Sequence, residues 1–215
     1  MIDLILVRTR NNPIPGVKKN SDSGSYSGRR MPPYGIMYIA KYVRQNGYSV
    51  ELFDLFKECY TPHSPDEIAD QILSHNPRIV GISAMTSQSL DAIALGDALM
   101  RKSDVCVVHG GVHFTSLPEE GLQHGHIVVQ GDGEHCMLQI ASSTKLHDLK
   151  NKILTGKPLN AEELDSIPFP KKEDFDETAY DPSLDPLFPI ITARGCPYSC
   201  VFCKEGYRSS NLRFH

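Results

Sequence analysis

The stretch SVELFDLFKECYTPHSPDEIADQILSHNPRIVGIS, residues 49–83, contains one complete unit of the predicted fold. Its two ends, 49–54 and 79–83, are short apolar runs typical of β-strands. Between them lies a helix-start signature made of an N-cap, a first-turn proline and a capping-box acid: Ser64, Pro65 and Glu67. A strand, a helix and a second strand in this order favour a parallel pair of strands with a covering helix.

The same alternation of strands and helices extends over residues 2–141. Further strand candidates are residues 3–7, 105–110 and 126–130, and further helix candidates are residues 34–47 and 87–102. Alternating strands and helices are typical of parallel sheets with helices on both faces. We therefore predict the α/β class, with a doubly wound, five-stranded parallel sheet of the flavodoxin-like kind.

The composition excludes several classes of protein. The 215 residues are 40% hydrophobic and 22% charged, with a formal net charge of -4. No long basic stretch is present, so a nucleic-acid partner is not indicated. The start of the chain lacks the layout of a signal peptide, and no apolar run approaches the 18 or so residues of a membrane span. We predict a cytoplasmic protein with no membrane partner.

The chain divides into three parts by composition. Residues 1–141 form the predicted α/β domain, and residues 142–187 read as an acidic linker that contains several prolines. A new apolar strand candidate at residues 187–193 leads directly into a cysteine-rich segment. We therefore expect a second domain to begin within residues 188–215.

A loop of more than twenty residues, 8–33, separates the first strand candidate from the first helix candidate. It lies at the carboxyl end of a strand, where ligands bind in open parallel sheets. Loops of this length are uncommon in compact domains and are often functional. A surface insertion without a binding role remains the alternative.

Small and hydroxyl-bearing residues recur where the later strand candidates end. The candidate binding residues are Ser83, Thr86, Gly110, Gly111, Gly131 and Gly133. Glycines let a bulky planar ligand approach the backbone, and the hydroxyls can meet the polar groups of a nucleotide tail. A tight strand-to-helix turn is the alternative explanation for the Gly110-Gly111 pair.

Three of the six cysteines, Cys196, Cys200 and Cys203, have the spacing C-x₃-C-x₂-C. Three thiolates on one tight loop can hold three irons of a cubane cluster and leave the fourth iron open for a ligand. The alternatives are a zinc site completed by a histidine, and inert thiols. The remaining cysteines stand alone in apolar surroundings and are read as core residues: Cys59, Cys106 and Cys136.

The segment RGCPYSCVFC, residues 194–203, resembles the cluster loop of the radical S-adenosylmethionine (SAM) enzymes. The resemblance implies that Cys196, Cys200 and Cys203 bind a 4Fe-4S cluster and that the aromatic Phe202 packs near SAM. In that family one electron cleaves SAM to methionine and a deoxyadenosyl radical. Such chemistry implies an electron donor such as flavodoxin or ferredoxin.

The upstream segments 32–54, 79–88, 107–120 and 127–134 are similar to the cobalamin-binding domain that precedes the barrel in one branch of these enzymes. The resemblance implies that the strand-end residues named above contact cobalamin. His113 is an additional candidate lining residue, with an ordinary loop histidine as the equal alternative. The D-x-H-x-x-G motif that supplies a lower cobalt ligand in many cobalamin domains is absent, because residues 8–16 read RTRNNPIPG.

The predicted function is therefore the N-terminal portion of a cobalamin-dependent radical SAM enzyme, with methyl transfer or radical rearrangement as the reaction and a small molecule or peptide as the substrate. Only 12 residues, 215 minus 203, follow the last cysteine. A barrel needs far more chain, so we expect a truncated enzyme that is inactive by itself. The alternatives are a stand-alone corrinoid-binding module, and a radical enzyme whose first domain binds no cobalamin.

Overall fold

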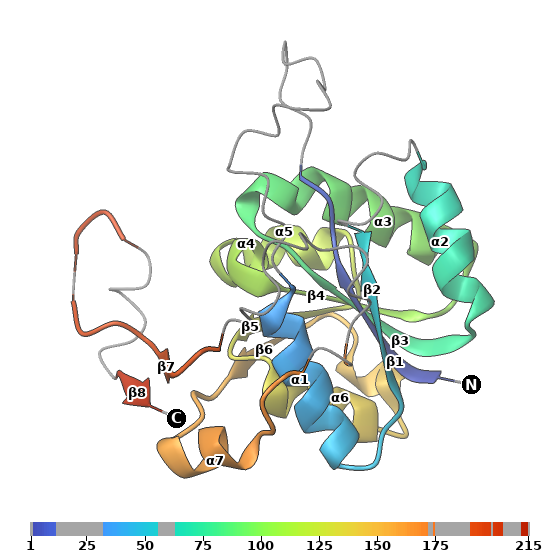
Figure 1. Cartoon of the computed structure of the whole chain (residues 1–215). Coiled ribbons are helices and arrows are strands. Elements are labelled where there is room, and N and C mark those ends of the chain that lie inside the picture. The colour runs from blue at the N-terminus through green and yellow to red at the C-terminus, as the bar shows by residue number, and fades with distance from the viewer. Residues whose placement is uncertain are drawn as a thin grey trace, which may run out of the picture.

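A six-stranded, fully parallel sheet forms the centre of the molecule in the computed structural model (Figure 1). The structure describes residues 2–11, 32–55, 63–171, 174, 190–198, 200–203 and 212–214. The strands of the sheet are β1 (Ile2–Arg8), β2 (Val50–Asp54), β3 (Pro77–Ser83), β4 (Cys106–Gly110), β5 (Ile127–Gly131) and β6 (Lys152–Gly156). The predicted α/β class and parallel sheet are confirmed.

The strand order is β2-β1-β3-β4-β5-β6, so the order along the sheet reverses at β1. Leu4 of β1 is paired with Val50 of β2 on one side and with Ile79 of β3 on the other. This is the flavodoxin-like order, in which ligands bind at the carboxyl ends of the strands beside the reversal. The predicted number of five strands is wrong, because β6 adds a sixth beside β5.

The sixth strand lies in the stretch that was predicted to be a linker. In β6 only Gly156 is buried, so the apolar pattern that reveals a strand is weak there. The same stretch also contains α7 (Ala161–Ser166), which begins with a capping box between Asn160 and Glu163. The position of the domain boundary stays a prediction, but β6 belongs to the sheet.

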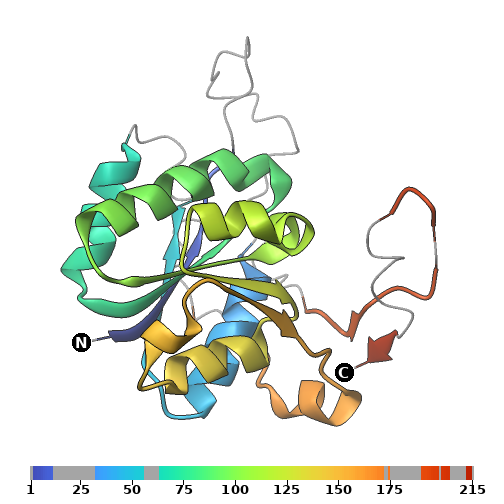
Figure 2. The ribbon, with the colours of Figure 1, turned by 180° about the vertical axis from the view of Figure 1, so that it is seen from behind.

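Two helical layers cover the sheet, as the opposite views in Figures 1 and 2 show. One layer contains α1 (Tyr34–Gln45) and α6 (Glu134–Ser142), and the other contains α2 (Pro65–Ser74), α3 (Ser89–Lys102), α4 (Gly111–Ser116) and α5 (Pro118–Gln123). A separate apolar cluster fills the space on each face, for example around Leu6 and Val108 below α1 and around Val80 and Val107 below α3. Short 3₁₀ turns also occur at Thr86–Gln88 and Leu146–Leu149.

The helix starts follow the expected chemistry. The Ser64 side chain accepts a hydrogen bond from the backbone N–H of Glu67, and the Glu67 carboxylate accepts one from the backbone N–H of Ser64. These bonds satisfy donors that the first turn of a helix leaves unpaired. The helices predicted over 34–47, over 64–77 and within 87–102 are all present.

The segment with the cysteines forms a short ribbon in place of the longer strand predicted at 187–193. The strand β7 covers only Ala193–Arg194 and pairs antiparallel with β8 (Arg213–Phe214). Ile190 is 62% exposed and lies outside β7, while residues 187–189 fall outside the described residues. The apolar run was therefore a misleading strand signal.

Residues 12–31 of the long loop also lie outside the described residues, as does Cys59. At the start of the loop, Arg10 forms an ion pair with Asp91 of α3, with 2.7 Å between Nη2 and Oδ1.

Among the helices that the structure describes, none is both long and apolar enough to cross a membrane.

A buried histidine links α3 to the sheet. His109 of β4 is fully buried, its ring lies 4.4 Å from the ring of Phe114, and its Nε2 lies 2.9 Å from the backbone oxygen of His124. Gly96 and Gly125 leave room for the ring, because a Cβ on either would come within 2.7 Å of it. Burial lowers the pKa of His109 from 6.5 to about 4, since the charged imidazolium is poorly solvated there.

We expect the free energy of unfolding to fall as the pH is lowered from about 6.5 to 4. In this window the unfolded chain binds a proton at His109 and the folded chain does not, so acid favours unfolding. One pKa unit corresponds to about 1.4 kcal/mol, which gives a total loss of about 3 kcal/mol. Urea unfolding at several pH values measures this loss.

The variant His109→Leu should show a smaller loss of stability over the same pH range. His147, whose side chain is 92% exposed, provides the matched control. His147→Leu should keep the pH dependence of the original chain. Equal pH dependence in the original chain and in His109→Leu would contradict the role of His109.

Candidate functional site

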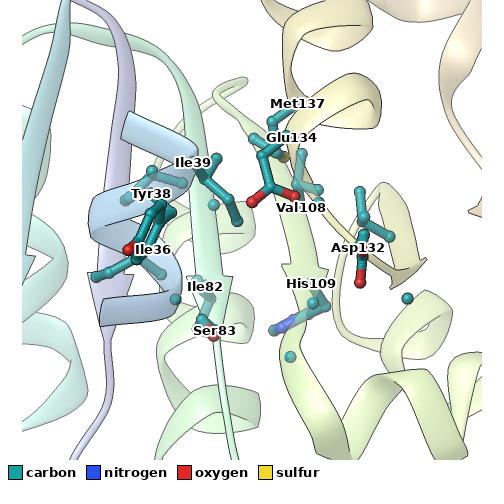
Figure 3. A pocket seen from close by; sticks show the side chains of 18 of the residues that line it. Ile36, Tyr38, Ile39, Ile82, Ser83, Val108, His109, Asp132, Glu134 and Met137 are labelled. Carbon is teal, nitrogen blue, oxygen red and sulfur yellow. The ribbon is translucent and has the colours of Figure 1, made fainter. Parts of the chain in front are cut away.

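A cleft of about 290 Å³ opens at the carboxyl edge of the sheet, between α1 and α6 (Figure 3). Its lining comes from β1, β3, β4, β5, both of these helices and the segment before the cysteines. The lining residues are Leu6, Gly35, Ile36, Tyr38, Ile39, Gly81, Ile82, Ser83, Val108, His109, Gly110, Gly111, Val129, Gly131, Asp132, Gly133, Glu134, Met137, Ile191 and Arg194. The cleft therefore lies beside the reversal of strand order, where the fold predicts a ligand site.

The cleft exists because small residues follow one another on one face of the sheet. Successive residues of a strand point to opposite faces, so every second residue shares a face. On the face that carries α1 and α6, β3 presents Gly81 and Ser83, β4 presents Gly110, and β5 presents Gly131. Because these positions have little or no side chain, the space at the strand ends between the two helices is left unfilled.

Gly110 and Gly111 differ in why each position is a glycine. Gly111 has a φ of +86°, and a Cβ there would lie 2.7 Å from the backbone oxygen of Ala84, so the fold itself requires this glycine. Gly110 has an extended backbone, and a Cβ there would meet nothing closer than 3.6 Å. The fold therefore tolerates a side chain at residue 110, and such a side chain would occupy the cleft.

Five of the seven predicted ligand contacts in the first domain line the cleft: Ser83, Gly110, Gly111, Gly131 and Gly133. Thr86 and His113 are outside its lining. The buried His113 ring instead has Nε2 2.7 Å from a carboxylate oxygen of Glu120 and Nδ1 3.4 Å from the Thr86 hydroxyl. His113 therefore connects α4 to α5, which favours the alternative that it is an ordinary loop histidine.

The charged residues of the cleft were not among the predicted site residues. Glu134 is 2% exposed, and its Oε1 lies 2.7 Å from Nη1 of Arg194. The Arg194 guanidinium also lies over the ring of Tyr38, 5.1 Å from its centroid. In Figure 3 the side chains of Ile39 and Glu134 point toward each other across the cleft. The sequence places Asp132 and Glu134 next to the predicted contacts Gly131 and Gly133, and this proximity is the signal that could have identified them.

Burial raises the pKa of all three tyrosines of α1, which are Tyr34, Tyr38 and Tyr42. Burial raises the pKa of Tyr34 to about 12, and burial also raises the pKa of Tyr38, although the positive charge of Arg194 acts in the opposite direction. The phenols of Tyr34 and Tyr38 therefore stay neutral at physiological pH. They contribute polar but uncharged groups close to the cleft wall.

The three clustered cysteines lie on the segment that follows β7. Cys200 is exposed and Cys196 and Cys203 are half-buried, and the backbone N–H of Cys203 donates to the carbonyl of Cys200 across a turn. Phe202, the predicted SAM contact, is 90% exposed. Within the described part of the chain, no group of three or more His, Cys, Asp or Glu side chains is arranged to hold a metal ion.

Cys106 and Cys136 are buried, as predicted for core residues. Burial raises the pKa of the Cys106 thiol to about 11 and also raises that of Cys136. A thiol is reactive only as the thiolate, so these two residues are inert at neutral pH. Reactive or ligating thiols are therefore expected in the segment of Cys196, Cys200 and Cys203.

Comparison with known proteins relates the chain to a cobalamin-binding family. The model of the B12 binding domain matches residues 24–141. An uncharacterized methyltransferase, PH0819, of Pyrococcus horikoshii is 32% identical over 203 residues, which are 87% of this chain and 42% of that protein. An anaerobic magnesium-protoporphyrin IX monomethyl ester cyclase of Rubrivivax gelatinosus is 26% identical, over 81% of this chain and 35% of that protein.

Among solved structures, the radical SAM methyltransferase TsrM of Kitasatospora setae, solved with a tryptophan substrate and a SAM analogue, has a similar fold. The TM-score is 0.64 at 16% identity, over 99% of this chain and 43% of that chain. A second structure of TsrM, with cobalamin and a [4Fe-4S] cluster bound, has a TM-score of 0.62. The chain spans less than half the length of each of these relatives.

The two adjacent glycines provide a paired test of the cleft geometry. Gly111→Ala should lower the free energy of unfolding by about 1–3 kcal/mol, because it forces a side chain into a left-handed backbone next to Ala84. Gly110→Ala should change it by less than about 0.5 kcal/mol, because the added methyl would come no closer than 3.6 Å to any neighbour. Urea unfolding of both variants measures the difference, and equal destabilisation would contradict this account.

Proposed function

Because the chain belongs to the B12-binding domain family, we propose that its cleft binds cobalamin and that the chain is the N-terminal portion of a cobalamin-dependent radical SAM enzyme. The observation that carries the proposal is the row of side-chain-free strand ends beneath α1 and α6. A protein that needed only a stable core would fill this space, because interiors are closely packed.

The residues of the cleft fit a large, flat ligand with polar groups at its edge. Ile36, Ile39 and Met137 provide apolar contact area. The Ser83 hydroxyl provides a polar contact at the end of β3. Gly110 supports the fit most directly, because the fold gives no other reason for a missing side chain there.

No histidine of the first strand's end is available as a lower cobalt ligand. The described residues after β1 are Thr9, Arg10 and Asn11, and Arg10 is held by Asp91. His109 lies in the cleft lining, but its ring packs against Phe114 in the opposite helical layer. We therefore propose that cobalamin is bound without a histidine from this domain.

The three clustered cysteines are the proposed ligands of a 4Fe-4S cluster, with Phe202 near SAM. All three are accessible enough to bind iron, and none of them needs to leave the core. Their thiolates are the ligands that such clusters use. When bound, the cluster and SAM supply one-electron chemistry to the enzyme.

The residues of this chain thus support two cofactor sites better than they define a reaction. We propose methyl transfer to a small molecule or a peptide, with radical rearrangement as the related alternative, and an electron donor such as flavodoxin or ferredoxin. These proposals concern the whole enzyme.

Hydroxocobalamin binding tests the role of the cleft. We expect the purified chain to change the visible absorption spectrum of hydroxocobalamin in a saturable titration. Gly110→Leu should weaken this binding at least about tenfold, or about 1.4 kcal/mol, because the new side chain fills the cleft.

Gln45→Leu is the matched control, because it adds the same side chain at the exposed far end of α1. Its affinity should equal that of the original chain. If the folded original chain does not bind hydroxocobalamin, or if Gly110→Leu binds as well as the original chain, the proposed cobalamin site is wrong.

Anaerobic reconstitution with iron and sulfide tests the cysteines. We expect close to four irons and four sulfides per chain, measured by elemental and sulfide analysis. Replacing Cys196, Cys200 and Cys203 by serine should abolish this uptake, whereas Cys106→Ser should not, because the Cys106 thiol is buried and protonated. Zinc uptake without sulfide by the same three cysteines would instead favour the zinc alternative.

A further inference from the structure

Two arginines lie directly opposite each other in the short ribbon of β7 and β8. The register pairs Arg194 with Arg213 and Ala193 with Phe214. Like charges at directly opposite positions of neighbouring strands destabilise the pair. The ribbon therefore needs negative charges close by if this register is to be stable.

The β5–α6 loop supplies both negative charges. Arg194 contacts Glu134 at 2.7 Å, and Nη1 of Arg213 donates to Oδ2 of Asp132 at 2.9 Å and to the backbone oxygen of Leu159 at 3.0 Å. Asp132 and Glu134 are two residues apart, so one loop neutralises both members of the arginine pair. The arginines are far from this loop in the sequence, which makes the match a tertiary contact.

The ion pairs are shielded from water. The side chain of Glu134 is 3% exposed, and those of Arg194 and Arg213 are 17% and 13% exposed. A shielded charge that loses its partner is strongly unfavourable, so such pairs enforce one particular arrangement. Ile191 adds an apolar contact, because it packs against the cluster around Tyr38, Leu159 and Leu164.

We infer that Asp132 and Glu134 form an intramolecular docking site that fixes the cysteine segment at the mouth of the cleft. Arg194 and Ile191 are themselves part of the cleft wall. Cys196 follows Arg194 by two residues, so its Cα lies within about 7 Å of the Arg194 Cα. Asp132 and Glu134 are thus positioning residues, and neither is a proposed cofactor ligand.

This inference rests on the proposed function for its purpose, which is to hold the two cofactor sites at a fixed separation. The same loop carries Gly131 and Gly133, which form the cleft, and Asp132 and Glu134, which hold the segment of the cluster. The docking itself uses contacts between protein groups and needs neither cofactor to be present. It can therefore be tested without either of them.

Limited trypsin digestion of the 215-residue chain tests the docking. Trypsin must bind the arginine side chain in its own pocket, so an Arg194 guanidinium engaged by Glu134 should be cleaved slowly at the Arg194–Gly195 bond. Glu134→Gln should raise this cleavage rate at least about tenfold, measured by mass spectrometry. Cleavage after the exposed Lys145 should stay unchanged and serves as the internal reference.

Glu162→Gln is the matched control variant, because Glu162 is exposed in the first turn of α7. It should cleave as the original chain does. Asp132→Asn provides a second route if Glu134→Gln does not fold, because Asp132 is more exposed; it should accelerate cleavage at Arg213–Phe214. Unchanged rates at both bonds in folded variants would overturn the inference.

A distance measurement tests the positioning role. A nitroxide is attached to Cys200 in a chain carrying Cys59→Ser, Cys196→Ser and Cys203→Ser. Cobalamin that has been reduced beforehand to its paramagnetic cobalt(II) form, and separated from the reductant, is then added without air. Pulsed electron paramagnetic resonance should give a narrow distance distribution, which Glu134→Gln should broaden. Equal widths in the two chains would overturn the positioning role. Absence of cobalamin binding would refute the proposed function, while the digestion would still decide the docking.

Discussion

The parallel pairing of β1 with both β2 and β3 is the constraint on which the rest of the structure depends. The chain leaves β1 in one direction to form β2 and must return across it to form β3. The helix α1 follows β1 and the helix α6 follows β5, and both lie over the same face of the sheet. The strand ends beneath them are then open to whatever side chains the sequence places there.

The sequence places almost no side chains at the strand ends on the face that carries α1 and α6. Gly81 illustrates how closely the remaining packing is matched, because a Cβ there would lie 2.8 Å from a Leu6 methyl and 3.3 Å from the Met137 methyl. Gly133 has a similar role, since a Cβ there would lie 2.7 Å from Ile39 of α1. Some glycines therefore allow the helices to approach, whereas Gly110 keeps the space between them open.

The elements with strong local signals were predictable from the sequence. The capping box of Ser64 and Glu67 and the apolar runs of the five predicted strands act through neighbouring residues, which a sequence displays directly. The strand β6 was missed because its side chains are mostly exposed and its stability comes from pairing with β5. The Glu134–Arg194 pair was missed because it depends on the tertiary placement of distant segments. Thr86 and His113 lie outside the lining of the cleft for the same reason, because tertiary contacts hold His113 against Thr86 and Glu120.

The docked ribbon has a thermodynamic consequence. Arg194 of the ribbon and Ile191 just before it also form part of the cleft wall, so a molecule in the cleft contacts a surface that exists only when the ribbon is docked. Binding and docking are then linked equilibria, and linkage is reciprocal. By whatever factor docking of the ribbon changes the affinity of the cleft for its ligand, the ligand changes the docking equilibrium by the same factor.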